Sequence, residues 1–299
     1  MDFWKYAGLV FLGGCSYGVV STFVKLAYRN GFTVSEITGS QYFCGAMMLW
    51  VLAFFVPRVK LSGKQWALLL ASGMPMGTTG IFYNYSLEYI NASFAIILLL
   101  QFTWINVVLQ YIFEKKVPDR KNLIAVAVVL SGSILAAGIL KSGFLLSWPG
   151  TAWGLLAAVS FALFIYISGH SGTFLHPVYK SAIMTSGAFL LVFALMPPVF
   201  LFSGVLENGL FKYGVLTGLF GSLIPPVLFS IGMPKVRSLG NILSASELPM
   251  AVLMSALVLR ETVGFSQWIG VFLILAGIAY PNLERNRLSV KSTYSSAQR

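Results

Sequence analysis

One acidic side chain lies in an otherwise apolar stretch of the sequence. Glu247 follows Ser244-Ala245-Ser246 and precedes Leu248-Pro249. An ionisable group inside a membrane helix costs several kcal/mol unless it is paired, hydrated or protonated, so Glu247 is a functional candidate. We expect it either to bind a substrate ammonium group or to take up a proton that drives exchange. The structural alternative is a protonated Glu247 whose hydrogen-bond partner is a backbone carbonyl freed near Pro249.

Residues that could support enzyme or metal chemistry do not form a recognisable set. His170 and His176 are six residues apart in a predicted loop, where we expect both to be solvated, and neither belongs to an H-E-x-x-H pattern. Cys15 and Cys44 both fall inside apolar runs, which gives no disulfide framework and no cluster of metal ligands. The sequence therefore favours a protein that is not an enzyme and that uses no cofactor and no metal.

Polar and aromatic side chains recur within the apolar runs at helical spacing. Tyr17 and Ser21 are four residues apart and share one helix face. On a later run, Gln101 with Trp104 forms one stripe, and Asn106 belongs to a second stripe on nearly the opposite side. Binding pockets are mostly apolar with a few placed polar groups, although any one aromatic residue could equally well pack or face lipid. The candidate substrate-binding residues are Tyr17, Ser21, Tyr83, Gln101, Trp104, Asn106, Phe161, Phe164 and Glu247.

Charged residues near one end of the first two apolar runs suggest a gate. Lys25 and Glu36 map to the same predicted side of the membrane and could form a salt bridge there. The alternative is that both side chains reach the headgroup region separately, since long charged side chains place their charge in water while their stems stay in apolar surroundings.

Composition identifies the environment in which these residues must work. Of the 299 residues, 57% are hydrophobic and 10% are charged, and the mean hydropathy is +0.81. Soluble domains carry about 25% charged residues, so the chain is a membrane protein. Its runs are apolar on every face, as in Ile96-Ile97-Leu98-Leu99-Leu100, whereas barrel strands alternate apolar and polar residues. The predicted fold class is therefore all-α.

Apolar runs between polar breaks predict ten transmembrane helices, each long enough to cross about 30 Å of hydrocarbon with modest adjustment. Basic residues predict their orientation, because cytoplasmic loops retain Lys and Arg. With the N-terminus inside, fifteen of the 20 basic residues lie inside and five outside, which places both termini in the cytoplasm and explains the net charge of +11 without a nucleic-acid partner. The predicted helices are 6–27, 36–56, 66–86, 92–113, 122–140, 150–168, 180–202, 213–232, 240–259 and 266–280.

The two halves of the chain resemble each other at an offset of about 146 residues. At this offset Glu114, which closes the fourth run, meets Glu261, which closes the ninth, and Gly8-Leu9 matches Gly154-Leu155. Five helices per half is an odd number, so the second half enters the membrane upside down relative to the first. Such inverted repeats are typical of secondary transporters.

Glycine and proline interrupt the third and eighth runs, which correspond to each other in the two halves. Paired interruptions of this kind are the best sequence indicator of a transporter site, although packing glycines would give the same local pattern. We expect hinges at Pro75, Gly77, Pro225 and Pro226.

The C-terminal half carries the clearest family resemblance. The stretch Ser244-Ala245-Ser246-Glu247-Leu248-Pro249, then Glu261, Gln267-Trp268-Ile269-Gly270 and Leu275-Ala276-Gly277 resembles the second EamA-type repeat of the drug/metabolite transporter superfamily. Glu114 with Leu130-Ser131-Gly132 resembles the first. The resemblance implies repeats over 1–141 and 149–281 with a tail over 282–299, a central cavity between the halves, and transport of small metabolites, often export of amino acids.

Together these observations predict a secondary transporter of the plasma membrane, of bacterial origin, that exports small amphipathic metabolites. Amino acids with apolar or aromatic side chains are the favoured substrates, and lipophilic cations or drugs are the alternative. A membrane-embedded enzyme and a non-transporting scaffold are less favoured readings. The expected partners are a small-molecule substrate and membrane lipid, and a monomer could suffice because the duplicated fold already supplies both halves.

Overall fold

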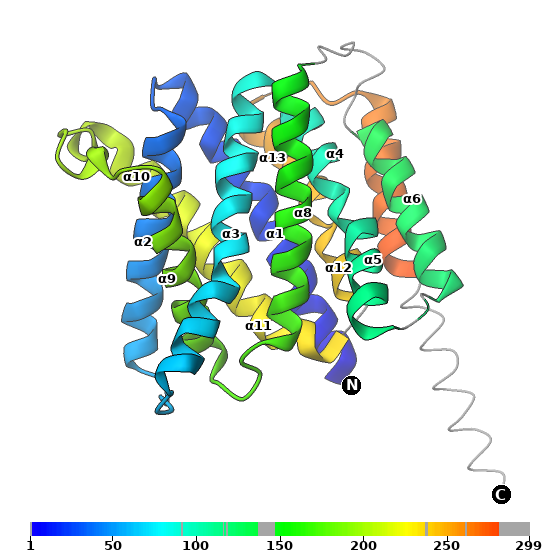
Figure 1. Ribbon diagram of the computed structural model, residues 1–299. Coiled ribbons are helices and arrows are strands. Elements are labelled where there is room, and N and C mark those ends of the chain that lie inside the picture. Colours follow the sequence, from blue (N-terminus) through cyan, green and yellow to red (C-terminus); the bar gives the residue numbers. More distant parts are fainter. Residues whose placement is uncertain are drawn as a thin grey trace, which may run out of the picture.

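The computed structural model describes residues 2–90, 92–115, 117, 119–136, 147–236, 239–260 and 262–280. These residues form helices and their connections, which run up and down through one bundle (Figure 1). Seven helical stretches are long and apolar enough to cross a membrane. With α3, α6 and the shorter helix Phe265–Tyr280 they make ten successive crossings, as the sequence predicts.

The first half comprises α1 (Asp2–Arg29), α2 (Val34–Phe54), α3 (Gly63–Tyr89), the consecutive helices α4 (Ala92–Leu100) and α5 (Phe102–Glu114), and α6 (Arg120–Ala136). Two of these helices begin with a capping box. The side chains of Thr33 and Ser62 accept from the backbone N–H groups of Glu36 and Gln65, whose side chains accept in turn from the backbone N–H groups of Thr33 and Ser62. The segment 137–140 of the predicted fifth helix lies outside the described residues.

The second half begins with α8 (Trp148–His170) and α9 (Pro177–Leu195). The seventh crossing ends at Leu195, seven residues earlier than predicted, because Pro197 and Pro198 cannot continue a helix. A short 3-10 turn, η1 (Val199–Leu201), follows. The eighth crossing is longer than predicted, and the ninth is divided. The eighth crossing consists of η2 (Leu206–Leu210), α10 (Phe211–Thr217), η3 (Gly218–Leu223) and α11 (Ile224–Val236). The ninth consists of α12 (Gly240–Ser244) and α13 (Glu247–Val258).

The two halves contact each other through equivalent helices. The first helix of the first half, α1, packs on α11, α12 and α13 of the second half. The first helix of the second half, α8, packs in the same way on α3, α4 and α5. Because each half binds the corresponding surface of the other, the bundle has the pseudo-twofold arrangement that an inverted repeat requires.

Helix breaks occur at corresponding positions in the fourth and ninth crossings. Gln101 separates α4 from α5, and the turn Ala245–Ser246 separates α12 from α13. At the repeat offset of about 146, Gln101 corresponds to Glu247, so the breaks fall within about two residues of each other. By contrast, α3 continues through Pro75 and Gly77 as one helix, and Pro225 and Pro226 are buried just after the π-helical turn η3.

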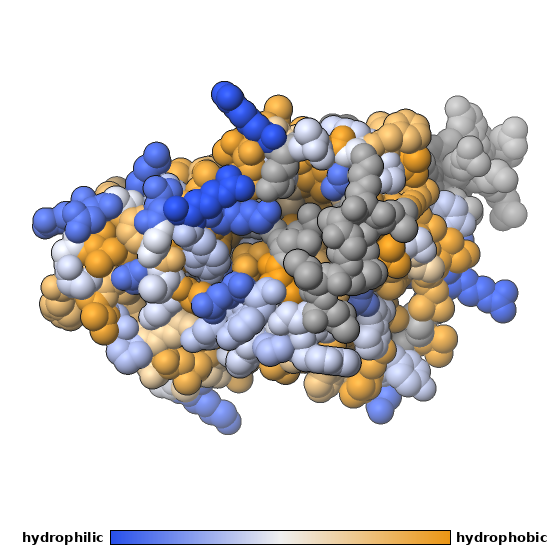
Figure 2. Space-filling model, turned by 90° about the horizontal axis from the view of Figure 1, so that it is seen from above, coloured by the Kyte–Doolittle hydropathy of each residue, from blue (hydrophilic) through white to orange (hydrophobic). Residues whose placement is uncertain are grey.

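Apolar side chains occupy the outside of the bundle as well as its core. Phe54, Phe265 and Phe272 are 71%, 81% and 68% exposed, a pattern that suits lipid and would be costly in water. Seen from above, hydrophilic residues lie across the middle of this end of the bundle, while apolar residues are frequent along its outline (Figure 2). Both ends of the described chain, Asp2 and Tyr280, lie at the opposite, lower end (Figure 1).

Candidate functional site

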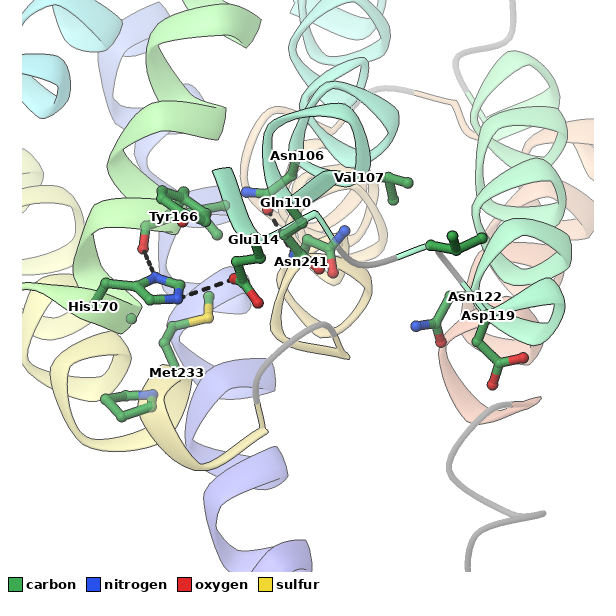
Figure 3. A pocket seen from close by; sticks show the side chains of 14 residues that line it. Asn106, Val107, Gln110, Glu114, Asp119, Asn122, Tyr166, His170, Met233 and Asn241 are labelled. Atoms are coloured by element: carbon green, nitrogen blue, oxygen red, sulfur yellow. Dashed lines mark hydrogen bonds and ion pairs between the residues drawn. The ribbon is translucent and has the colours of Figure 1, made fainter. Parts of the chain in front are cut away.

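A cavity of about 570 Å³ is open at the lower end of the bundle, where α5 and α8 end (Figure 3). Its polar side chains come from α5, α8, α12 and the start of α6, and its apolar wall includes Val107, Ile165 and Met233. This combination gives an amphipathic cavity in the size range of sites for small organic molecules. The lining residues are Asn106, Val107, Gln110, Glu114, Val117, Asp119, Asn122, Ile165, Tyr166, Gly169, His170, Met233, Pro234 and Asn241.

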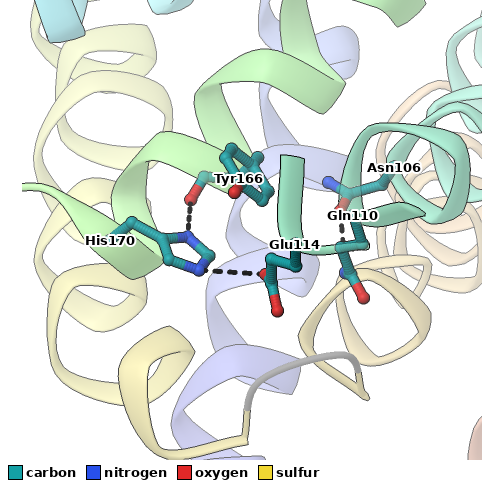
Figure 4. Close-up of polar contacts among 5 residues, drawn as sticks. All are labelled: Asn106, Gln110, Glu114, Tyr166 and His170. Atoms are coloured by element: carbon teal, nitrogen blue, oxygen red, sulfur yellow. Dashed lines mark hydrogen bonds and ion pairs between the residues drawn. The ribbon is translucent and has the colours of Figure 1, made fainter. Parts of the chain in front are cut away.

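An ion pair joins the ends of two helices beside this cavity (Figure 4). The Nε2 of His170 lies 3.1 Å from Oε1 of Glu114, and its Nδ1 lies 2.7 Å from the carbonyl oxygen of Tyr166, on whose ring the imidazole stacks. The prediction of a loop position is wrong for His170, which is the last residue of α8, whereas His176 is an exposed residue that precedes α9.

Among the predicted polar residues, Asn106 lines the cavity. Its Nδ2 donates to the carbonyl of Ala162 at 3.1 Å, and its Oδ1 accepts from Gln110 at 3.0 Å. Gln101 lies one turn earlier, where its Oε1 accepts from the Trp104 indole at 2.9 Å. Trp104 itself is 45% exposed and belongs to the outer surface of the bundle.

Aromatic rings fill the space next to the inner end of the cavity. Phe161 lies one turn from Ile165, and its ring meets the rings of Tyr17 and Phe102 edge-on, with centroid distances of 5.3 and 4.8 Å. Phe164 stacks near Phe161 at 6.2 Å. These contacts bring together the predicted residues Tyr17, Phe161 and Phe164. We call this group, with Phe102 and Phe229, the aromatic cluster.

Glu247 is buried beyond the aromatic cluster, at the first position of α13. Its side chain is 5% exposed, and its Oε2 has no hydrogen-bond partner among the described residues. The hydroxyls of Tyr17 and Tyr83 are likewise buried and without a partner in this part of the chain, and both interact electrostatically with Glu247. Gly18 permits the close approach, because a Cβ there would lie 2.3 Å from the Glu247 carbonyl oxygen.

A second, smaller cavity of about 50 Å³ lies on the other side of Glu247. Ser21 and Lys25 of α1 line it, together with Leu248, Ala251 and Ser255 of α13. The predicted gate partner Glu36 instead lies at the start of α2, where its Oε2 accepts hydrogen bonds from Thr33 at 2.8 and 2.9 Å. The buried carboxyl therefore lies between two cavities at opposite ends of the bundle.

Lys180 is a buried basic residue near the start of α9. It belongs to the first turn of α9 and is 1% exposed, and its Nζ donates to the carbonyl oxygen of Ser168 at 2.7 Å. Ser168 is in the last turn of α8, so Lys180 satisfies a carbonyl at a helix C-terminus. We assign it a role in joining α8 to α9.

Comparisons with known proteins agree with this architecture. One crystal structure, titled only as that of a protein, has a TM-score of 0.67 and 17% sequence identity, covering 93% of this chain and 98% of its own. Identity at this level supports the fold alone. No curated protein matches the chain. The model of the EamA-like transporter family matches twice, over residues 4–138 and 148–282. The chain belongs to the EamA-like transporter family, and it is a multi-pass membrane transporter of the drug/metabolite type.

Proposed function

We propose that this protein is a secondary transporter that exports small amphipathic metabolites, with amino acids bearing apolar or aromatic side chains as the leading substrates. The observation that carries the proposal is the pair of cavities, of about 570 and 50 Å³, at opposite ends of the bundle with the aromatic cluster and Glu247 between them. A large cavity at one end and a small one at the other is the arrangement expected of one state in an alternating-access cycle.

The symmetry of the packing supports two states of similar free energy. The helices α1 and α8 each pack on the equivalent helices of the other half. If each half adopted the conformation that the other half has now, the lower cavity would close and the upper one would enlarge. At Gln101 and at Ala245–Ser246 the backbone N–H groups donate to the carbonyl three residues earlier while the dihedrals stay helical. We assign these matched irregularities as the places where the fourth and ninth crossings bend.

The distribution of basic residues supports the proposed export direction. Lys5, Lys115, Arg120, Lys121 and Lys235 lie near the ends of helices on the same side as the wide cavity. The positive-inside rule assigns that side to the cytoplasm. The wide cavity would then load substrate from the cytoplasm and release it outside.

Glu247 is the residue to which we assign coupling. Its unpartnered Oε2 and the two unpartnered tyrosine hydroxyls near it suit either a substrate ammonium group or an exchanged proton. Glu247→Gln keeps the shape of the side chain and removes its ability to change charge. We expect this variant to lose most active transport and its dependence on pH, and unchanged transport with normal pH dependence would exclude both roles.

The experiment is solute counterflow in proteoliposomes with a labelled panel of aromatic, branched and hydroxy amino acids. Wild type, Glu247→Gln and empty vesicles are compared. We expect saturable accumulation of one side-chain class by the wild type. If no amino acid moves through folded, inserted protein, the leading substrate class is wrong.

A lipophilic cation is the second candidate substrate, favoured by the acidic side chains Glu114 and Asp119 at the wide cavity. Protection of cells against a cationic dye, in the absence of amino-acid flux, would favour it over amino acids.

A further inference from the structure

Three of the four amide side chains that line the wide cavity, those of Asn106, Gln110 and Asn241, have orientations that their partners dictate. The Nδ2 of Asn106 lies 3.1 Å from the Ala162 carbonyl, and the Nδ2 of Asn241 lies 3.2 Å from the Thr103 carbonyl. A carbonyl oxygen only accepts, so the nitrogen of each amide must face it. Because Asn106 thereby presents its Oδ1, the neighbouring Gln110 must donate to it through Nε2, at 3.0 Å.

These orientations leave the amide oxygens of Asn241 and Gln110 as acceptors for a ligand. The Oδ1 of Asn241 is buried without a donor among the described residues, on a side chain that is 2% exposed and lines the cavity. The Oε1 of Gln110 has no donor in the same part of the chain. A buried polar atom without a partner costs about 1–3 kcal/mol, so a ligand that donates to Asn241 recovers that cost.

The charge of the cavity agrees with its hydrogen-bonding character. Glu114 and Asp119 contribute carboxylates to the lining, and the described lining residues include neither Lys nor Arg. Figure 3 shows Asn241, Gln110 and Glu114 approaching one another from α12 and α5. Several oxygen acceptors and a carboxylate beside an apolar wall fit a protonated amine attached to an apolar body.

We propose that the wide cavity recognises its substrate through an ammonium group, with Asn241 Oδ1 and Gln110 Oε1 as direct hydrogen-bond acceptors and Glu114 as the nearby negative charge. This deepens the proposed function and rests on it, because it names the part of the substrate that is recognised first. It also separates the initial recognition of the amine in the cavity from the role of Glu247 beyond the aromatic cluster.

The test measures binding to the purified protein, which does not require transport. The probes are phenethylamine, which has an ammonium group and no carboxylate, and phenyllactate, which has a carboxylate and no ammonium group. The variants are Asn241→Leu and Gln110→Met. Gln110 is only partly buried, so Gln110→Met gives a folded protein if Asn241→Leu does not. The matched control is Asn84→Leu, which removes an equally buried amide outside the cavity that donates to Thr38.

We expect the wild type and Asn84→Leu to bind phenethylamine with equal affinity and to bind phenyllactate at least tenfold more weakly. Because a hydrogen bond to a charged group is worth about 1.5–3 kcal/mol, each cavity variant should lose about tenfold to hundredfold in phenethylamine affinity. The proposal is overturned if phenyllactate binds as tightly as the amine, if neither probe binds, or if the cavity variants bind the amine like the wild type. If counterflow is absent but the protein still binds the amine in a way that depends on Asn241, the proposed transport is refuted and the recognition site is not.

Discussion

The helices α3 and α9, which belong to different halves of the protein, pack closely against each other. Gly73 of α3 allows this because it has no side chain between its own backbone and the backbone of Met184 in α9. A Cβ built on Gly73 would lie 1.7 Å from the carbonyl oxygen of Met184, whereas ordinary contact begins at 3.4 Å. In Gly73→Ala the two helices must therefore separate locally by about 1.7 Å, because the atom in the way is backbone and cannot rotate aside. Overpacking of this kind typically costs about 1–3 kcal/mol.

A matched substitution isolates this cost from helix propensity. Replacing Gly by Ala inside a helix gains about 1 kcal/mol in either position. Gly8 of α1 has nothing within 4 Å of its added Cβ, so Gly8→Ala receives this gain without a clash. The free energies of unfolding of the two variants should differ by the overpacking cost, about 1–3 kcal/mol in favour of Gly8→Ala.

The assay is thermal unfolding of both variants in the same detergent, followed by the loss of monodisperse protein. At about 2–4 °C per kcal/mol, Gly73→Ala should melt about 2–12 °C below Gly8→Ala. Equal melting temperatures would refute the close approach of α3 and α9, and with it the packing of the two halves described above.

Two further predictions concern buried groups. Lys180→Met removes the side-chain donor to the Ser168 carbonyl and should lower stability by about 1.5–3 kcal/mol in the same melting assay, whereas Lys64→Met, at an exposed position, should change it little. Phe161→Ala removes the ring between Tyr17 and the wide cavity. It should raise passive efflux of substrate from loaded proteoliposomes at least severalfold over Leu155→Ala, an exposed position on the same helix, and equal efflux would show that Phe161 is not part of the barrier.

Sequence predicted the number and order of the crossings because apolar length is a direct requirement of the bilayer. It did not predict the break at Gln101, since the surrounding residues contain no glycine or proline and the run is apolar on both sides. The hinge at Pro75 and Gly77 stays a prediction. The helix α3 continues through Pro75, whose carbonyl accepts from the Thr79 hydroxyl at 2.7 Å, so this proline by itself does not divide the helix.

The sequence also did not predict which side chains face lipid and which face the interior of the bundle. In a soluble helix the polar side identifies the surface, but here most faces are apolar whether they meet lipid or protein. The sequence could therefore mark Trp104 and Phe161 as aromatic candidates without separating the exposed one from the buried one. It also did not place His170 and Asn241 at the cavity that Glu114 lines, because their meeting there depends on helices from both halves of the chain.

Alternating access is tested most directly by the accessibility of two cysteines, one in each cavity. Val107→Cys lines the wide cavity and Ser255→Cys the small one, each in a background with Cys15→Ser and Cys44→Ser. Each is labelled with a membrane-impermeant maleimide from its own side, with and without a substrate identified by counterflow. We predict reciprocal changes, with Val107→Cys labelled rapidly at rest and Ser255→Cys slowly, and substrate slowing the first while accelerating the second. Labelling that rises or falls together at both positions would contradict a pathway that opens at one end at a time.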